Sequence, residues 1–157
     1  MAIDVSPGAA EVCRRRGVQD VRLLPLAGVD ERLGVFDTVL MMCGNFGLVG
    51  SAEEAAATLD RLHTMTSPKG RIVLDTVDPY VDSDASDIVY MERNRERGRM
   101  PGQVTIRIRY GELATPWYDL LNVSVAELDG LMAGTGWRVA RVVEGERPDF
   151  YAILEKA

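Results

Sequence analysis

Short apolar runs alternate with amphipathic stretches along the first half of the chain. The runs are rich in valine, leucine and isoleucine, which is typical of buried strands, and they lie at residues 2–5, 21–26, 35–42 and 71–75. Between them, Ser6 and Ser51 are suitable N-cap residues for two stretches with helical spacing of apolar positions. This order of strands and helices predicts an α/β fold with a parallel sheet and crossover helices on both faces.

The pattern changes in the second half of the chain. Alternating polar and apolar residues predict an inserted β-hairpin around residues 88–110, with one face in water. A capping box that begins at Ser124 predicts a helix. Two further strands are expected at residues 137–143 and 150–154. Because a parallel crossover needs a dozen or more residues, these last two strands must form an antiparallel hairpin.

Length and composition describe an ordinary folded domain. The 157 residues, with 46% hydrophobic and 27% charged residues, are expected to form a single domain over residues 1–157. The formal net charge of −6 argues against nucleic acid and anionic membranes as partners. No apolar run reaches the roughly 20 residues that span a bilayer, and the first residues lack the basic and then apolar order of a signal peptide. The two cysteines are expected to be free thiols, so we expect a cytoplasmic protein.

The candidate site lies where two strands end. The segment Cys43–Gly50 is rich in glycine and follows a strand, and ligands of open α/β sheets bind beyond the carboxyl ends of the strands. Asp4 ends the first strand, directly before the Ser6 cap. We expect Asp4 and the bend after Met42 to face each other across a gap of nucleoside size. Asp4 could instead be a structural charge at a helix N-terminus.

These features resemble class I S-adenosylmethionine-dependent methyltransferases over nearly the whole chain. The resemblance implies a Rossmann-like, mostly parallel sheet and S-adenosyl-L-methionine as the cofactor. It implies that the Asp4 carboxylate holds the ribose hydroxyls, which suits a group that accepts two charge-assisted hydrogen bonds. The cofactor-binding residues that it implies are Asp4, Val5, Ala27, Gly28, Met42, Cys43, Gly44 and Asn45.

One motif of that family is not found. Its glycine-rich loop after the first strand should precede Asp4, so we expect a shortened form of a longer methyltransferase. A sheet without that strand either closes up, borrows a strand from another chain or exposes its edges. Exposed edges would favour homo-oligomers.

The acceptor side is less defined. Its candidate residues are Phe46, Asp75, Tyr80, Trp117 and Tyr118. The aromatic residues could instead fill the core, which is the more common case, and the evident candidate bases are carboxylates such as Asp75. The acidic composition favours a small-molecule acceptor over nucleic acid. No catalytic residue can be assigned, and no pair of Cys or His residues has the spacing of metal ligands.

Two other classes of function stay open. The first is an NAD-dependent oxidoreductase, in which an equivalent carboxylate holds the ribose, although the closing antiparallel hairpin speaks against it. The second is a non-catalytic module, which would be either a degenerate methyltransferase or a subunit that a partner completes.

Overall fold

A computed structural model describes residues 1–146 and 148–157. Its helices are α1 (Pro7–Arg15), α2 (Ala52–Thr64), α3 (Ala85–Glu96) and α4 (Val125–Leu131). Three short 3-10 helices are η1 (Leu26–Gly28), η2 (Glu31–Leu33) and η3 (Asn45–Val49). The strands are β1 (Ala2–Asp4), β2 (Val21–Leu23), β3 (Phe36–Met41), β4 (Thr66–Val77), β5 (Gln103–Ile106), β6 (Arg109–Tyr110), β7 (Leu113–Ala114), β8 (Tyr118–Leu121), β9 (Trp137–Glu144) and β10 (Asp149–Lys156).

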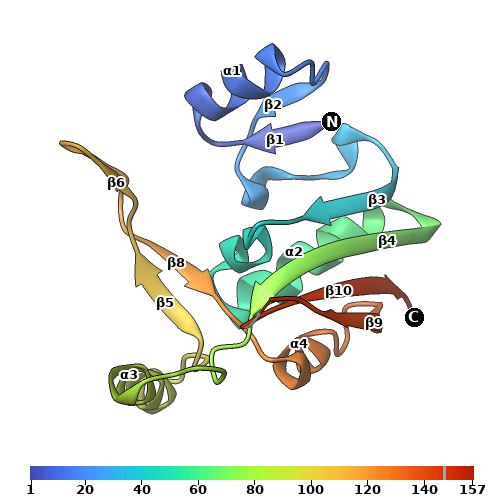
Figure 1. Cartoon of the computed structure of the whole chain (residues 1–157). Coiled ribbons are helices and arrows are strands. Elements are labelled where there is room, and N and C mark those ends of the chain that lie inside the picture. The colour runs from blue at the N-terminus through green and yellow to red at the C-terminus, as the bar shows by residue number, and fades with distance from the viewer. Residues whose placement is uncertain (147) are drawn as a thin grey trace.

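Most of these strands form a mixed four-stranded sheet and a separate parallel pair. The four-stranded sheet has the order β3-β4-β10-β9, in which the neighbours β3 and β4 are parallel and β10 is antiparallel to both of its neighbours. The predicted C-terminal antiparallel hairpin is confirmed as β9 and β10. Strands β3, β4 and β9 run in one direction, as expected for a mostly parallel sheet, and β10 alone runs opposite to them because it inserts between β4 and β9. Strands β1 and β2 pair in parallel with each other, and they lie above β3 in Figure 1.

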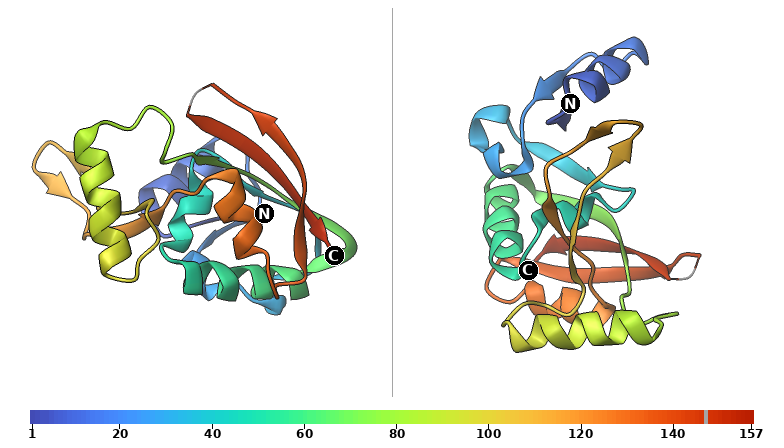
Figure 2. Two further views of the ribbon diagram at one scale, coloured as in Figure 1. Left: turned by 90° about the horizontal axis from the view of Figure 1, so that it is seen from below. Right: turned by 90° about the vertical axis from the view of Figure 1, so that its left-hand side faces the viewer.

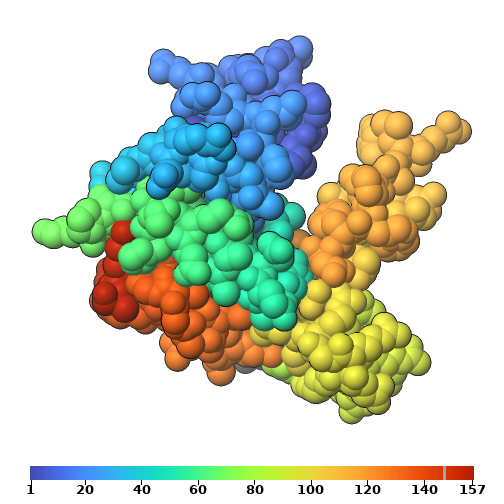
Figure 3. Space-filling view, turned by 180° about the vertical axis from the view of Figure 1, so that it is seen from behind, coloured from blue at the N-terminus to red at the C-terminus, as the bar shows by residue number. Residues whose placement is uncertain are grey.

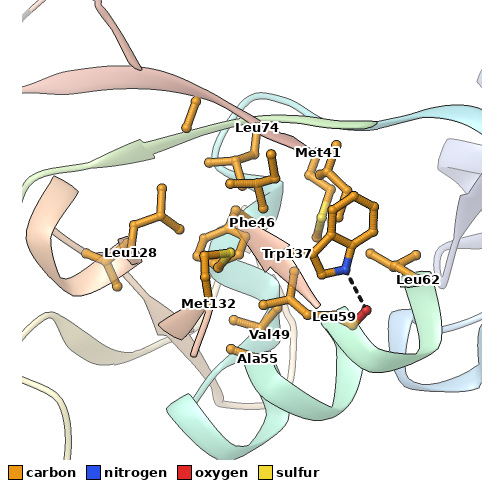
Figure 4. Packing of buried hydrophobic residues seen from close by; sticks show 14 of the residues in the cluster. Met41, Phe46, Val49, Ala55, Leu59, Leu62, Leu74, Leu128, Met132 and Trp137 are labelled. Carbon is orange, nitrogen blue, oxygen red and sulfur yellow. Dashed lines mark hydrogen bonds between the residues drawn. The ribbon is translucent and has the colours of Figure 1, made fainter. Parts of the chain in front are cut away.

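The core lies under one face of the four-stranded sheet. Helices α2 and α4 pack there side by side (Figure 2, left). Figure 4 shows Phe46, Leu59, Leu74 and Leu128 in this core, and each of these side chains is fully buried. Trp137 closes one end of the core, and its indole Nε1–H donates a hydrogen bond of 2.9 Å to the carbonyl of Leu59.

The second face of the four-stranded sheet is more open than predicted. Leu40 on β3, Tyr151 on β10 and Val143 on β9 are all partly exposed. Helix α1 packs on β1 and β2, not on this sheet. The expectation of helices on both faces is therefore wrong for the four-stranded sheet within the described residues. Alternate residues of β4 are buried only on the side that faces α2 and α4.

The predicted hairpin around residues 88–110 is also wrong in its first half. Residues 85–96 form helix α3. Asp84 accepts hydrogen bonds from the amides of Ser86 and Asp87, and the Asp87 carboxylate accepts one from the Asp84 amide. This reciprocal capping box starts a helix, and the Met, Glu and Arg residues that follow favour its continuation. Their helical preference outweighs the β-branched residues Ile88 and Val89, which are left partly exposed.

The second half of that segment does form a strand, with a different partner. Strand β5 pairs antiparallel with β8, and β6 pairs with β7 at the far end of the same ribbon. We call residues 103–121 the arm. Figure 3 shows its tip projecting from the body of the molecule. Arg99, Gln103 and Thr105 all bond to the carboxylate of Asp119 on β8 and so brace the base of the arm.

No helix among the described residues has the length and apolar character needed to cross a bilayer.

Candidate functional site

A cavity of about 520 Å³ lies between the β1–β2 pair and β3. Asp4 and Val5 line it from the end of β1, and Asn45 and Leu48 line it from η3. The two features that the sequence predicts to face each other, an early carboxylate and the bend after Met42, therefore lie at one cavity. Apolar residues form much of the remaining wall, among them Leu24, Leu26, Val29 and Met41.

Asp4 has both a structural contact and a place in this cavity. Its Oδ1 accepts a hydrogen bond of 2.7 Å from the backbone amide of Ser6. Ser6 in turn caps α1, with Pro7 in the first turn as expected. Within residues 1–146 and 148–157, Asp4 Oδ2 accepts no hydrogen bond. The carboxylate thus anchors the turn into α1 through one oxygen, while Asp4 as a residue lines the cavity.

The other predicted cofactor residues lie next to the cavity lining. Ala27 and Gly28 belong to η1 and lie between two lining residues, Leu26 and Val29. Met42, Cys43 and Gly44 form the turn between two further lining residues, Met41 and Asn45. The segments that the sequence indicates thus border the cavity. Of the predicted residues in these two segments only Asn45 lines it, and otherwise the residues next to them form the wall.

The turn after β3 has an unusual backbone. Cys43 has a φ of 62° and Gly44 a φ of 74°, so both residues are left-handed. Glycine adopts this conformation freely, whereas cysteine is rare in it because of its Cβ. Asp75 Oδ2 accepts a hydrogen bond of 3.0 Å from the Cys43 amide, and Oδ1 accepts one of 2.8 Å from the Gly44 amide.

Phe46 does not line an acceptor site. Its side chain is fully buried in the core, so the expectation that it lines an acceptor pocket is wrong. The reason lies in η3, which turns Phe46 and Val49 inward and leaves Asn45 and Leu48 outward. Gly47 holds η3 tightly against the arm, since an added Cβ there would lie 2.8 Å from Leu120.

The remaining acceptor-side aromatic candidates lie in two places, because Trp117 and Tyr118 are on the arm and Tyr80 contacts α4. Trp117 is 62% exposed on the arm, and the Arg107 guanidinium lies 4.7 Å from its ring centre. Tyr118 follows Trp117 on the arm and is half-buried in β8. Tyr80 donates a hydrogen bond of 2.6 Å from its hydroxyl to Glu127 of α4. Burial and this carboxylate raise the pKa of Tyr80.

A second cavity was not predicted from the sequence. Its volume is about 460 Å³, and it lies between α3, the segment after β4 and the start of the arm. Asp78, Asp82, Asp87 and Tyr90 are among its lining residues. Helix α3 forms one wall of this cavity, and the sequence pattern predicted a strand for that segment. The cavity therefore could not be predicted.

Comparison with known proteins shows a clear structural likeness. A SAM-dependent methyltransferase from Bacteroides fragilis, solved with S-adenosyl-L-homocysteine, matches with a TM-score of 0.79 and 28% identity over 99% of this chain and 62% of its own. An amino pentose methyltransferase from Micromonospora echinaspora, solved with SAM, gives a TM-score of 0.59 and 19% identity over 99% and 72% of the two chains. A 1,6-didemethyltoxoflavin-N1-methyltransferase from Burkholderia thailandensis gives 0.57 and 16% identity over 99% and 60%.

The chain therefore has the fold of class I S-adenosylmethionine-dependent methyltransferases. It spans 62% of the length of the Bacteroides fragilis enzyme. No protein-family model matches the sequence, and no curated protein does either.

Proposed function

We propose that this chain is a methyltransferase domain that uses S-adenosyl-L-methionine and acts on a small molecule. The observation that carries the proposal is that Asp4 and Asn45 line one cavity of about 520 Å³ at the ends of β1 and β3. That volume is within the usual range for small-molecule and cofactor sites. The fold that surrounds the cavity is shared with methyltransferases that were solved with SAH or SAM.

The residues of this cavity suit a nucleoside with a charged sulfonium. The oxygen of Asp4 that accepts no described bond can accept a ribose hydroxyl, and a charged acceptor strengthens such a bond. Leu26 and Val29 offer apolar surface for an adenine ring, and Asn45 offers an amide for polar groups. The cofactor would supply an activated methyl group. The protein would then mainly hold donor and acceptor in line.

A small-molecule acceptor is supported by two observations. The net charge of −6 disfavours nucleic acid, and two of the structural neighbours are named as methyltransferases of an amino pentose and of 1,6-didemethyltoxoflavin. The exposed Trp117 and its neighbour Arg107 on the arm could contact such an acceptor.

The free thiols of Cys13 and Cys43 suit a reducing compartment, so the proposed location is the cytoplasm.

A second candidate is a module that another strand completes. Among the described residues, β1 and β3 belong to separate sheets, and the cavity between them is lined by both. Each strand pairs on one side only, which leaves a free edge. Such edges could also bring two copies of the chain together. Analytical ultracentrifugation tests this self-association: a weight-average molecular mass equal to that of one chain from micromolar to millimolar concentration would argue against it.

Calorimetric titration with S-adenosyl-L-homocysteine tests the proposal. We expect binding by the unchanged chain, and Asp4→Asn should weaken it by about 1–3 kcal/mol because the ribose loses a charged acceptor. Asp20→Asn is the matched control, since Asp20 pairs with Arg22 and does not line the cavity. No heat with the unchanged chain would contradict the proposal and favour the module. Equal affinity of the unchanged chain and Asp4→Asn for S-adenosyl-L-homocysteine would instead assign Asp4 a structural role.

A further inference from the structure

Asp75 lies beside the turn after β3 because β4 runs parallel to β3. Met41 is paired with Leu74 in the register of these two strands, so Asp75 stands one residue beyond the last paired position. Its carboxylate reaches across to the Cys43 and Gly44 amides at 3.0 and 2.8 Å. The sequence separation is 32 and 31 residues, so the contact depends on the sheet and not on local chain geometry.

The two amides point at one anion because of the backbone conformation. Cys43 and Gly44 are successive residues with positive φ, and the N–H groups of both donate to the one carboxylate. Consecutive amides that converge in this way form a concave site for an anion. Here the carboxylate of Asp75 occupies that site and gives one oxygen to each amide. These two hydrogen bonds offset the free-energy cost of the left-handed conformation at Cys43, which is unfavourable for any residue with a Cβ atom.

The turn sets the position of the segment that lines the cavity. Gly44 is the N-cap of η3, which directly follows the turn. From η3, Asn45 and Leu48 face the cavity, while Phe46 is fully buried. A change in the Cys43–Gly44 backbone would therefore move Asn45 relative to Asp4.

We propose that Asp75 is a positioning residue that fixes the turn at residues 42–44 and so holds Asn45 at the cofactor cavity. This inference rests on the proposed function. It replaces the expectation that Asp75 serves as a base or contacts the acceptor, since its carboxylate bonds to the turn and Asp75 lines neither of the two cavities.

Amide hydrogen exchange of the ligand-free chain, resolved by NMR, tests the first half of the proposal. Asp75→Asn keeps the size of the side chain, yet its amide nitrogen cannot accept a hydrogen bond. We expect exchange at Cys43 and Gly44 to become about tenfold faster, while the amides of β3 and β4 change less than twofold. Asp37→Asn is the matched control, because Asp37 lies on β3 and bonds to the Ser67 hydroxyl instead. Unchanged exchange in Asp75→Asn would overturn the proposal.

Affinity for S-adenosyl-L-homocysteine tests the second half. We expect Asp75→Asn to bind about tenfold more weakly than the unchanged chain, and Asp37→Asn to bind equally well. Adding Cys43→Gly to Asp75→Asn should recover part of the affinity, because glycine adopts the left-handed conformation without help. Faster exchange with unaltered affinity would overturn the positioning role while leaving the proposed function intact. If the unchanged chain does not bind, the proposed function fails and this half fails with it, whereas the exchange result still reports on the turn.

Discussion

At the scale of single residues, two carboxylates define the site by different means. Asp4 accepts the Ser6 amide hydrogen bond with one oxygen and lines the cavity. Asp75 gives both oxygens to the turn that carries Asn45 towards the same cavity. One carboxylate is thus suited to contact a ligand, and the other to order the wall of the site.

The fully buried Phe46 and the exposed Trp117 should respond very differently to truncation. Phe46→Ala leaves a cavity in the core, so we expect it to lower the free energy of unfolding by about 3–5 kcal/mol. Trp117→Ala removes a side chain that is 62% exposed, so we expect a change of less than about 1 kcal/mol. Urea denaturation of both variants measures these changes in the free energy of unfolding. Similar losses in the two variants would contradict the assignment of Phe46 to the core.

At the scale of secondary-structure elements, the sequence predicts the regular parts well. The helical spacing of apolar positions after Ser51 predicts a helix, and in α2 those positions, Ala55, Leu59 and Leu62, are buried in the core. The short connection before the last strand correctly requires an antiparallel hairpin. These predictions succeed because each depends on local spacing or chain length alone.

The failures concern signals that compete or that act over long distances. In α3 a capping box at Asp84 competes with a short run of β-branched residues, and the cap prevails. The partner of β5 is β8 and not the preceding segment, which the alternating pattern cannot reveal. The contact of Asp75 with Cys43 and Gly44 likewise appears only once β3 and β4 lie side by side.

The base of the arm is expected to depend on pH through Asp119. A hydrogen bond from the Thr105 hydroxyl, assisted by Gln103 and Arg99, lowers the pKa of Asp119 below its usual value of 3.8. A carboxyl whose pKa is lowered by folding stabilises the folded chain at pH values above its unfolded pKa. This contribution is lost as the pH falls through the folded-state pKa.

We therefore expect Asp119→Asn to be less stable than the unchanged chain at neutral pH. The difference in the free energy of unfolding should shrink once the pH falls below the usual value of 3.8. Urea denaturation at a series of pH values provides the measurement. Glu112→Gln, at the exposed tip of the arm, is the control and should show no such trend. A difference that grows on acidification would contradict this account of Asp119.

At the scale of the whole molecule, the site lies between two separate sheets. The β1–β2 pair brings Asp4, and the four-stranded sheet brings the turn after β3. The acidic cavity beside α3 lies elsewhere in the fold and shares no lining residue with the first. The two cavities therefore give clearly different predictions for where a nucleoside would bind.

The most direct test is a titration of the ¹⁵N-labelled chain with S-adenosyl-L-homocysteine, followed by NMR. The account predicts that the amides of residues 3–5 and 41–45 shift together and saturate at one concentration, since both segments border the cavity between β1 and β3. Shifts confined to residues 82–90, which border the cavity beside α3, would contradict it. So would shifts in only one of the two predicted segments.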